Sequence, residues 1–204
     1  MVTIILFTYN ELKKIYISMK ERFKISTLEI AGFVSVLAAL RLPFGKEMRS
    51  EAEWSPTVIA PDNVQFHSSF CINEKDLQLM STLIKRGDEH AKAIRGLQVY
   101  AVIEAPRWMW QEIDTYRIGT DRLSSESTMH IDAKGLSNEE LMDFKDRIEE
   151  GKIQKRIQMF SYQTLRRIYF QRRNHRLPVW HQFCEWVESL PFAEELITIE
   201  KDEK

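Results

Sequence analysis

The feature that most constrains this chain is the run of residues 105–130, where an aromatic helix passes into a segment rich in hydroxyl groups. Pro106 suits the first helical position, and Gly119 can end the helix. The apolar side of this helix would consist of Trp108, Trp110, Ile113 and Tyr116. Directly before it, residues 97–104 (LQVYAVIE) are rich in β-branched and aromatic side chains and predict a strand.

Short hydroxyl side chains dominate the nine residues after Gly119, namely Thr120, Ser124, Ser125, Ser127 and Thr128. Arg117 and Arg122 lie among them. Hydroxyls, backbone N–H groups and guanidinium groups are what a phosphate needs. Two interpretations stay open at this stage: a phosphate-binding loop, or a polar surface loop that follows a core helix.

A block of positive charge lies nearer the C-terminus. Residues 151–184 contain no Asp or Glu, and they hold Lys152, Lys155, Arg156, Arg166, Arg167, Arg172, Arg173 and Arg176. Because the whole chain has a formal net charge of only −1, this local segregation favours an anionic ligand over general adhesion to nucleic acid or membrane. The alternative is a solvated helix face paired with acids from elsewhere, such as those of residues 139–150.

Composition limits the class of protein. The chain has 204 residues, 44% apolar and 29% charged, which are values of one soluble globular domain. Its two cysteines, Cys71 and Cys184, show neither the spacing of a metal site nor that of a disulfide framework. This fits a reducing compartment, so we expect a cytoplasmic protein. No two histidines have the spacing of paired metal ligands, so we expect no bound metal. No apolar run could span a membrane. Residues 1–18 are predicted as an N-terminal extension, and residues 19–204 as the single domain.

The remaining elements follow from hydrophobic spacing, caps and breakers. They are a strand at 23–30, a helix at 33–42, a loop at 45–70, a helix between Asn73 and Gly87, a helix after the capping box of Ser137 and Glu140, a helix at about 157–173, and a last helix from Pro178. The sequence therefore predicts an α+β fold, in which a small, mostly antiparallel sheet is covered by about five helices.

This order of elements resembles the flavin-dependent thymidylate synthases. In that family a start like K-I-x-x-L-x-x-G-F-V-x-x-V leads to A-A-R-x-S-F, and here Lys24-Ile25, Leu28 and Gly32-Phe33-Val34 precede the ALRLPF of residues 39–44. The family's K-x-G-H-E is matched by the KRGDE of residues 85–89, and its strand ending in A-P by residues 99–106.

The family's signature is altered in this chain. Its R-H-R triplet is Thr115-Tyr116-Arg117, and the Ser seven residues onward is Ser125. Alternatively, Ser127 matches the Ser of the family's S-x-R-Y, with an insertion of two residues. The family's N-x-R-x-L-x-x-F is occupied by Ser161, Gln163, Leu165 and Ile168.

The resemblance implies FAD-dependent methylation of dUMP to dTMP, with methylenetetrahydrofolate and NADPH, at sites between the subunits of a homotetramer. It places Thr115, Tyr116 and Arg117 at the cofactor. It assigns the dUMP phosphate to Ser125, Ser127, Arg122 and either Arg172 or Arg173. No protein nucleophile is needed and no catalytic residue is assigned. In a divergent synthase Arg122, Arg166 or Arg95 would take over the roles of the signature residues that this chain has replaced. The alternative is a non-catalytic relative that binds a nucleotide or flavin or serves in assembly.

One geometric expectation concerns the two adjacent arginines. Neighbouring residues on a helix diverge by about 100°, so Arg172 and Arg173 should point to different sides. We expect one of them to enter a pocket near Ser125 or Ser127. The spacing from Leu165 favours Arg172, and the spacing to Trp180 favours Arg173.

Overall fold

The computed structural model describes residues 22–46, 51–52 and 70–201. Its main sheet has four antiparallel strands in the order β1-β4-β6-β5, which are β1 (Lys24–Ala31), β4 (Gln98–Pro106), β6 (Ile153–Ser161) and β5 (Thr120–Ser125). A second, two-stranded sheet pairs β2 (Glu51–Ala52) with β3 (Phe70–Cys71). The predicted α+β class with an antiparallel sheet is confirmed.

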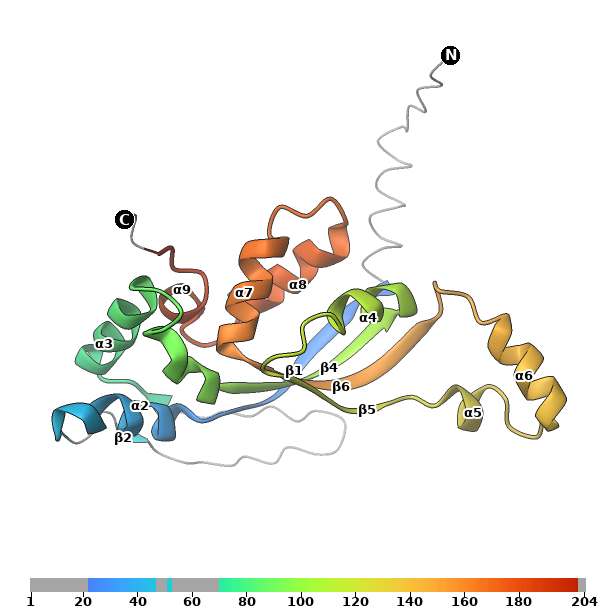
Figure 1. Ribbon diagram of the computed structural model, residues 1–204, viewed down its shortest axis with the longest axis horizontal. Helices are drawn as coiled ribbons and strands as arrows, with labels where there is room; N and C mark the ends of the chain where they lie inside the picture. Colours follow the sequence, from blue (N-terminus) through green and yellow to red (C-terminus); the bar gives the residue numbers. More distant parts are fainter. Residues whose placement is uncertain (1–21, 47–50, 53–69, 202–204) are drawn as a thin grey trace, which may run out of the picture.

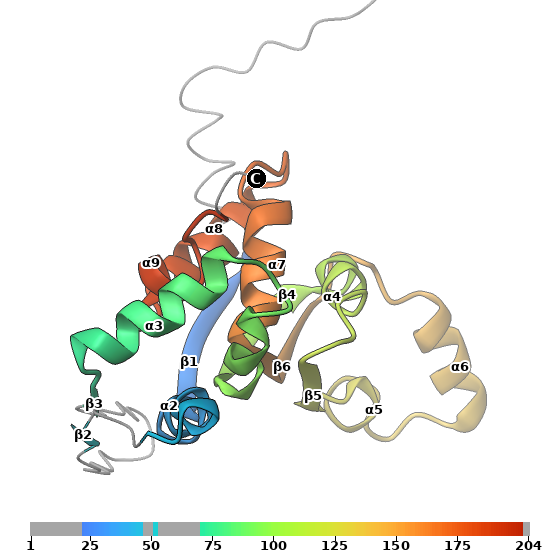
Figure 2. The same ribbon diagram turned by 60° about the vertical axis from the view of Figure 1, so that its left-hand side comes forward.

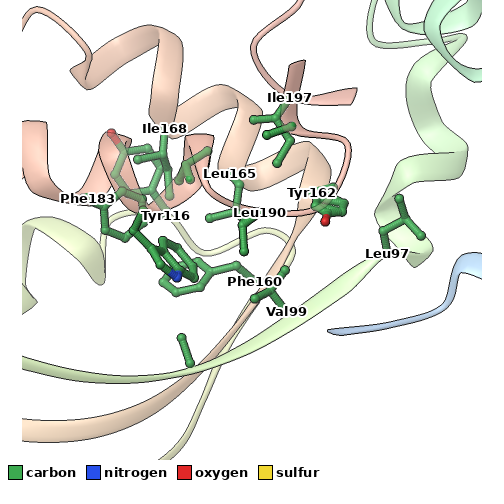
Figure 3. Packing of buried hydrophobic residues seen from close by; sticks show 14 of the residues in the cluster. Leu97, Val99, Tyr116, Phe160, Tyr162, Leu165, Ile168, Phe183, Leu190 and Ile197 are labelled. Atoms are coloured by element: carbon green, nitrogen blue, oxygen red, sulfur yellow. The ribbon is translucent and has the colours of Figure 1, made fainter. Parts of the chain in front are cut away.

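Helices cover one face of the main sheet (Figure 1). In β4 the side chains of Val99, Ala101 and Ile103 are fully buried, and they alternate with half-exposed neighbours. Such alternation is typical of an antiparallel sheet with one covered face. The covering helices are α7 (Tyr162–Arg172), α8 (Pro178–Glu188) and α9 (Ala193–Leu196). Figure 3 shows the core that results, in which Val99 and Phe160 of the sheet lie near Leu165 and Phe183 of the helices.

The N-terminal half of the chain packs beside this core. It contains α2 (Phe33–Arg41), the 3-10 turn η1 (Leu42–Phe44), α3 (Glu74–Lys85) and the 3-10 helix η2 (Ala91–Gly96). Asn73 caps α3 as predicted, accepting a hydrogen bond from the Lys75 N–H. Arg41 Nε donates to the buried Asp76 carboxylate over 2.7 Å. This ion pair ties α2 to α3.

The aromatic helix is confirmed as α4 (Arg107–Ile113), but it ends at Ile113 rather than at Gly119, so Tyr116 lies beyond its C-terminus. Trp110, Ile113 and Tyr116 are buried, and Trp108 is half-buried. The Trp110 indole N–H donates to the carbonyl of Gln154 in β6 over 2.9 Å, so this large side chain is satisfied as well as packed. Pro106 is the last residue of β4 and the N-cap of α4.

The predicted helix over residues 157–173 is wrong in its first part. Residues 153–161 form β6, which pairs with β4 on one side and β5 on the other, and α7 begins only at Tyr162. The sequence misleads because two polar side chains on β6, Arg156 and Gln158, are buried. Arg156 stacks over Trp110 at 4.3 Å and pairs with Asp114 at 3.0 Å. Strand pairing on both sides therefore outweighs the local pattern.

The hydroxyl-rich segment also differs from the predicted loop. Residues 120–125 are the edge strand β5, and a single-turn helix α5 (Thr128–Ile131) follows. The capping box of Ser137 and Glu140 is confirmed at the start of α6 (Asn138–Asp146). In Figure 1, α5 and α6 stand at one end of the molecule, beyond the sheet.

Some expectations fall outside the described residues. They are the N-terminal extension at 1–18 and most of the loop at 45–70. The division of the chain into an extension and one domain stays a prediction. Within the described ranges, no helix is long and apolar enough to cross a membrane.

Candidate functional site

A pocket of about 630 Å³ lies where α7, η2 and the C-terminal segment meet. Volumes of this order are typical of small-molecule sites. Its wall consists of Asp88, Arg95, Ile118, Gln163, Thr164, Arg166, Arg167, Phe170, Gln171, Glu200 and Lys201.

One face of α7 supplies much of this wall. Gln163, Arg167 and Gln171 follow one another at a spacing of four residues, which places them on one side of a helix. The helix is fixed at its start by Ser161, whose hydroxyl accepts a hydrogen bond from the Thr164 N–H over 3.2 Å. Thr164 Oγ1 in turn donates to the carbonyl of Ile118 over 2.7 Å. This bond holds the turn before β5 at the pocket.

Arg166 is a cation built into the wall. It is buried, and its Nη1 donates to the backbone carbonyls of Ile197, over 2.6 Å, and Ile199. Its guanidinium lies over the Phe170 ring at 4.7 Å. Burial lowers the pKa of Arg166, which the charges of Asp88 and Glu200 partly oppose. An arginine stays protonated in such a place, so the wall keeps its positive charge.

Two further cations of the wall lack an acidic partner. Arg95 Nε donates to the side-chain carbonyl of Gln163 over 2.5 Å, and Arg167 lies over the Tyr116 ring at 5.7 Å. In the described part of the chain, neither forms an ion pair.

The two acids of the wall are engaged by other cations. Asp88 pairs with Lys201 at 3.2 Å, and Glu200 pairs with Arg173 at 2.8 Å. The pocket therefore has an excess of positive charge, which suits an anionic ligand.

The residues predicted at the cofactor lie next to this pocket but differ in exposure. Thr115 is exposed and its hydroxyl donates to the Glu112 carbonyl over 2.7 Å. Tyr116 is buried, with its ring edge against Trp180 at 6.3 Å. Arg117 is exposed and directly precedes Ile118 of the pocket wall. Their binding roles stay predictions.

Arg172 and Arg173 point to different sides of α7, as predicted. Arg172 is held by Glu112 at 3.1 Å and donates to the Tyr116 hydroxyl over 2.8 Å. Its guanidinium stacks over Trp180 at 4.4 Å. Arg173 instead faces the C-terminal segment through its pair with Glu200. Neither arginine belongs to the pocket wall.

The residues of the hydroxyl-rich segment that were predicted to contact phosphate lie outside the wall of the large pocket. Arg122 and Ser125 are exposed on β5, opposite Gln158 and Arg156 of β6. Ser127 caps α5 and lines a smaller pocket of about 120 Å³. Within the described residues, no contact joins Ser125 or Ser127 to Arg172 or Arg173.

The sequence did not single out several residues of the pocket wall, namely Gln163, Arg167, Phe170, Gln171, Asp88 and Lys201, as candidate site residues. The four-residue spacing along α7 carried a usable signal. This signal was obscured because the helix was predicted to begin at about residue 157, whereas α7 begins at Tyr162. Lys201 had no sequence signal, since it reaches the pocket only through the path of the C-terminal segment.

Cys184 is a buried side chain in α8. Burial, aided by the negative charges of Glu188 and Glu185, raises the pKa of its thiol to about 12. The thiolate is the reactive form, so this cysteine packs as a small hydrophobe, in line with the sequence-based interpretation.

Comparisons with known proteins identify the fold. No family model matches the sequence, and no curated protein does. Solved structures that are similar in fold include the flavin-dependent thymidylate synthase ThyX from Helicobacter pylori complexed with FAD and dUMP, and a second structure of thymidylate synthase X from the same organism with FAD and dUMP. Both have a TM-score of 0.59 and 12% sequence identity. The matches cover 88% and 86% of this chain, and 100% and 97% of theirs. The chain therefore has a ThyX-like fold.

Proposed function

We propose that this chain binds FAD and dUMP and methylates dUMP to dTMP with methylenetetrahydrofolate and NADPH, as a distant relative of the flavin-dependent thymidylate synthases. The observation that carries the proposal is the pocket at α7, in which Arg95, Arg166 and Arg167 have no ion-pair partner in the described part of the chain. A homotetramer, as the family resemblance implies, belongs to the same proposal.

The wall of the pocket fits a flavin nucleotide. Arg95 and Arg167 offer guanidinium groups to phosphate oxygens, for which their donor geometry is suited. The amides of Gln163 and Gln171 can donate to and accept from the polar edge of a ring. Phe170 supplies an apolar surface. When bound, FAD would supply the hydride transfer that no side chain of this pocket offers.

Arg166 acts differently from the other two arginines. Its hydrogen bonds to the carbonyls of Ile197 and Ile199 fix its position. It would therefore attract a phosphate by charge while it orients the C-terminal wall.

The test measures binding and turnover separately. We expect the purified protein, titrated with FAD, to give flavin absorbance that stays with the protein in gel filtration. With FAD, NADPH and methylenetetrahydrofolate present, tritium should be released from dUMP labelled at ring carbon 5. Absence of flavin binding would refute the proposal.

A second function is favoured by the position of Arg172. Of the two candidates for the family's dUMP-binding arginine, Arg172 and Arg173, the spacing from Leu165 favours Arg172, yet Arg172 is engaged by Glu112, Tyr116 and Trp180. A chain whose arginine is so engaged could bind flavin or nucleotide without catalysing the methylation. Flavin binding with tritium release equal to that of a no-enzyme control would establish this alternative.

Arg167→Ala is expected to weaken FAD or dUMP binding roughly 10- to 100-fold, about 1.4–2.7 kcal/mol, because a charge-assisted hydrogen bond of that order is lost. Isothermal titration calorimetry measures the change. Arg176→Ala is the matched control, since Arg176 is exposed and lies outside the pocket wall. Equal affinities for both variants would exclude Arg167 from the site.

A further inference from the structure

The C-terminal segment that follows α9 runs along the wall of the large pocket. It continues beyond α9 without a further helix or strand in the described residues (Figures 1 and 2). Its first half is anchored, because the buried Arg166 donates to the carbonyls of Ile197 and Ile199. Its second half, Glu200 and Lys201, is exposed and belongs to the pocket wall. The two halves therefore differ in how firmly the fold holds them.

Glu200 brings a carboxylate to a wall that is rich in arginine. Its Oε1 accepts a hydrogen bond from Nη1 of Arg173 over 2.8 Å. Burial lowers the pKa of Arg166, and the charges of Asp88 and Glu200 partly oppose that shift, so the carboxylate acts on two guanidinium groups. A phosphate oxygen forms the same kind of charge-assisted hydrogen bond with an arginine. Glu200 thus makes contacts that an anionic ligand would make.

Arg173 lies beside the pocket, although it is not part of the wall. Its guanidinium lies over the ring of Phe170 at 4.8 Å, and Arg166 lies over the same ring at 4.7 Å. Phe170 itself lines the pocket. Because a cation is attracted to an aromatic ring, this contact keeps Arg173 near the pocket even when its carboxylate partner leaves.

The contact between Arg173 and Glu200 is of a kind that exchanges readily. Both side chains are exposed, and water and salt screen such a pair. The next residue, Lys201, is held only by an exposed pair with Asp88. A phosphate group carries more negative charge than one carboxylate, so it can replace Glu200 as the partner of Arg173 while Arg166 keeps the first half of the segment in place.

We propose that Glu200 is an internal competitor of the ligand: its carboxylate holds Arg173 until a phosphate-bearing ligand displaces it and gains Arg173 as a contact. Arg95 and Arg167 bind Gln163 and the Tyr116 ring instead, so Glu200 leaves them open to the same ligand. The inference rests on the proposed function only in that the pocket takes an anion, and it requires no flavin chemistry.

The experiment titrates inorganic pyrophosphate into the full-length protein by isothermal titration calorimetry, at fixed pH and salt and without FAD. Glu200→Gln removes the charge and keeps the size of the side chain. It should bind pyrophosphate about two- to fivefold more tightly than the unmodified protein, which corresponds to the competition of one exposed ion pair. Glu194→Gln, the same change at an exposed position of α9 outside the wall, should bind like the unmodified protein.

Two more variants separate displacement from a general effect of charge. Glu200→Asp keeps the charge but shortens the side chain by one methylene, which weakens its contact with Arg173, so it should also bind pyrophosphate more tightly. Arg173→Gln should weaken binding, because the ligand no longer gains this contact. Arg176→Gln removes the same charge from an exposed residue outside the wall and should leave the affinity unchanged.

The outcomes are decided by the pyrophosphate affinities, once circular dichroism has shown that the variants are folded. An affinity of Glu200→Gln that does not exceed that of the unmodified protein would overturn the inference, and so would pyrophosphate that binds to neither. A gain in Glu200→Gln without one in Glu200→Asp would show that only charge matters, against the inference. A protein that gives the expected pyrophosphate pattern but does not bind FAD would refute the proposed function and leave the competition by Glu200 established.

Discussion

Arg172→Ala is expected to lower the free energy of unfolding by about 2–3 kcal/mol, because it removes one partner of a half-buried ion pair and a stacked cation together. Among its partners in the described residues, the Glu112 carboxylate would keep the indole N–H of Trp180, which donates to it over 2.9 Å. The Tyr116 hydroxyl would lose the donor that now reaches it over 2.8 Å. Urea denaturation followed by Trp fluorescence measures the loss.

Arg173→Ala is the matched control for this experiment. Arg173 is the next residue along α7, but its pair with Glu200 is exposed, at 38% and 67% of the two side chains. Exposed pairs contribute less than about 1 kcal/mol, so this variant should unfold almost like the unmodified protein. If instead Arg172→Ala left stability unchanged and abolished dUMP binding, Arg172 would be a ligand contact that turns toward the nucleotide.

Gly32→Ala is expected to have the larger effect, a loss of at least about 3 kcal/mol in the free energy of unfolding. Gly32 caps α2 with a φ of +100°, and a Cβ there would lie 2.0 Å from the carbonyl oxygen of Gly96. The left-handed backbone alone costs about 1–2 kcal/mol for an alanine, and the contact forces backbone to move. Since Gly96 ends η2, the movement would also displace Arg95 at the pocket.

Gly87→Ala separates these two contributions. Gly87 has a similar φ of +109°, but a Cβ there would meet no atom within 4 Å. We expect a loss of about 1–2 kcal/mol, the cost of the backbone conformation alone. Thermal unfolding of both variants by circular dichroism gives the comparison. Equal losses would show that the close approach of α2 to η2 relaxes freely.

The helices that begin with a recognisable start signal were predicted well. Asn73 caps α3, Ser137 and Glu140 form the capping box of α6, and Pro178 is the first residue of α8. These signals are local, because a cap satisfies backbone N–H groups of its own first turn. The strand over β4 was equally clear, since its alternate side chains are apolar and buried.

The strands β5 and β6 could not be predicted in the same way. β6 buries Arg156 and Gln158 because Trp110, Asp114 and two neighbouring strands are present around them. β5 is an exposed edge strand with polar side chains, and its residues carry no hydrophobic alternation. In both strands the pairing partner, rather than the local sequence, supplies the hydrogen bonds that fix the conformation.

The candidate site was likewise predictable only in those features that depend on the local sequence. The sequence by itself determined the excess of cations over residues 151–184, the cap signals, the central strand and the divergence of Arg172 from Arg173, because each depends on composition or on helix periodicity. Only the tertiary structure decided which cations meet. It engaged Arg172 with Glu112, and it brought Arg95, Arg166 and Arg167 to one pocket with the C-terminal segment. These contacts join residues distant in sequence, and whether a cation is paired or open to a ligand depends on which acids the fold places beside it.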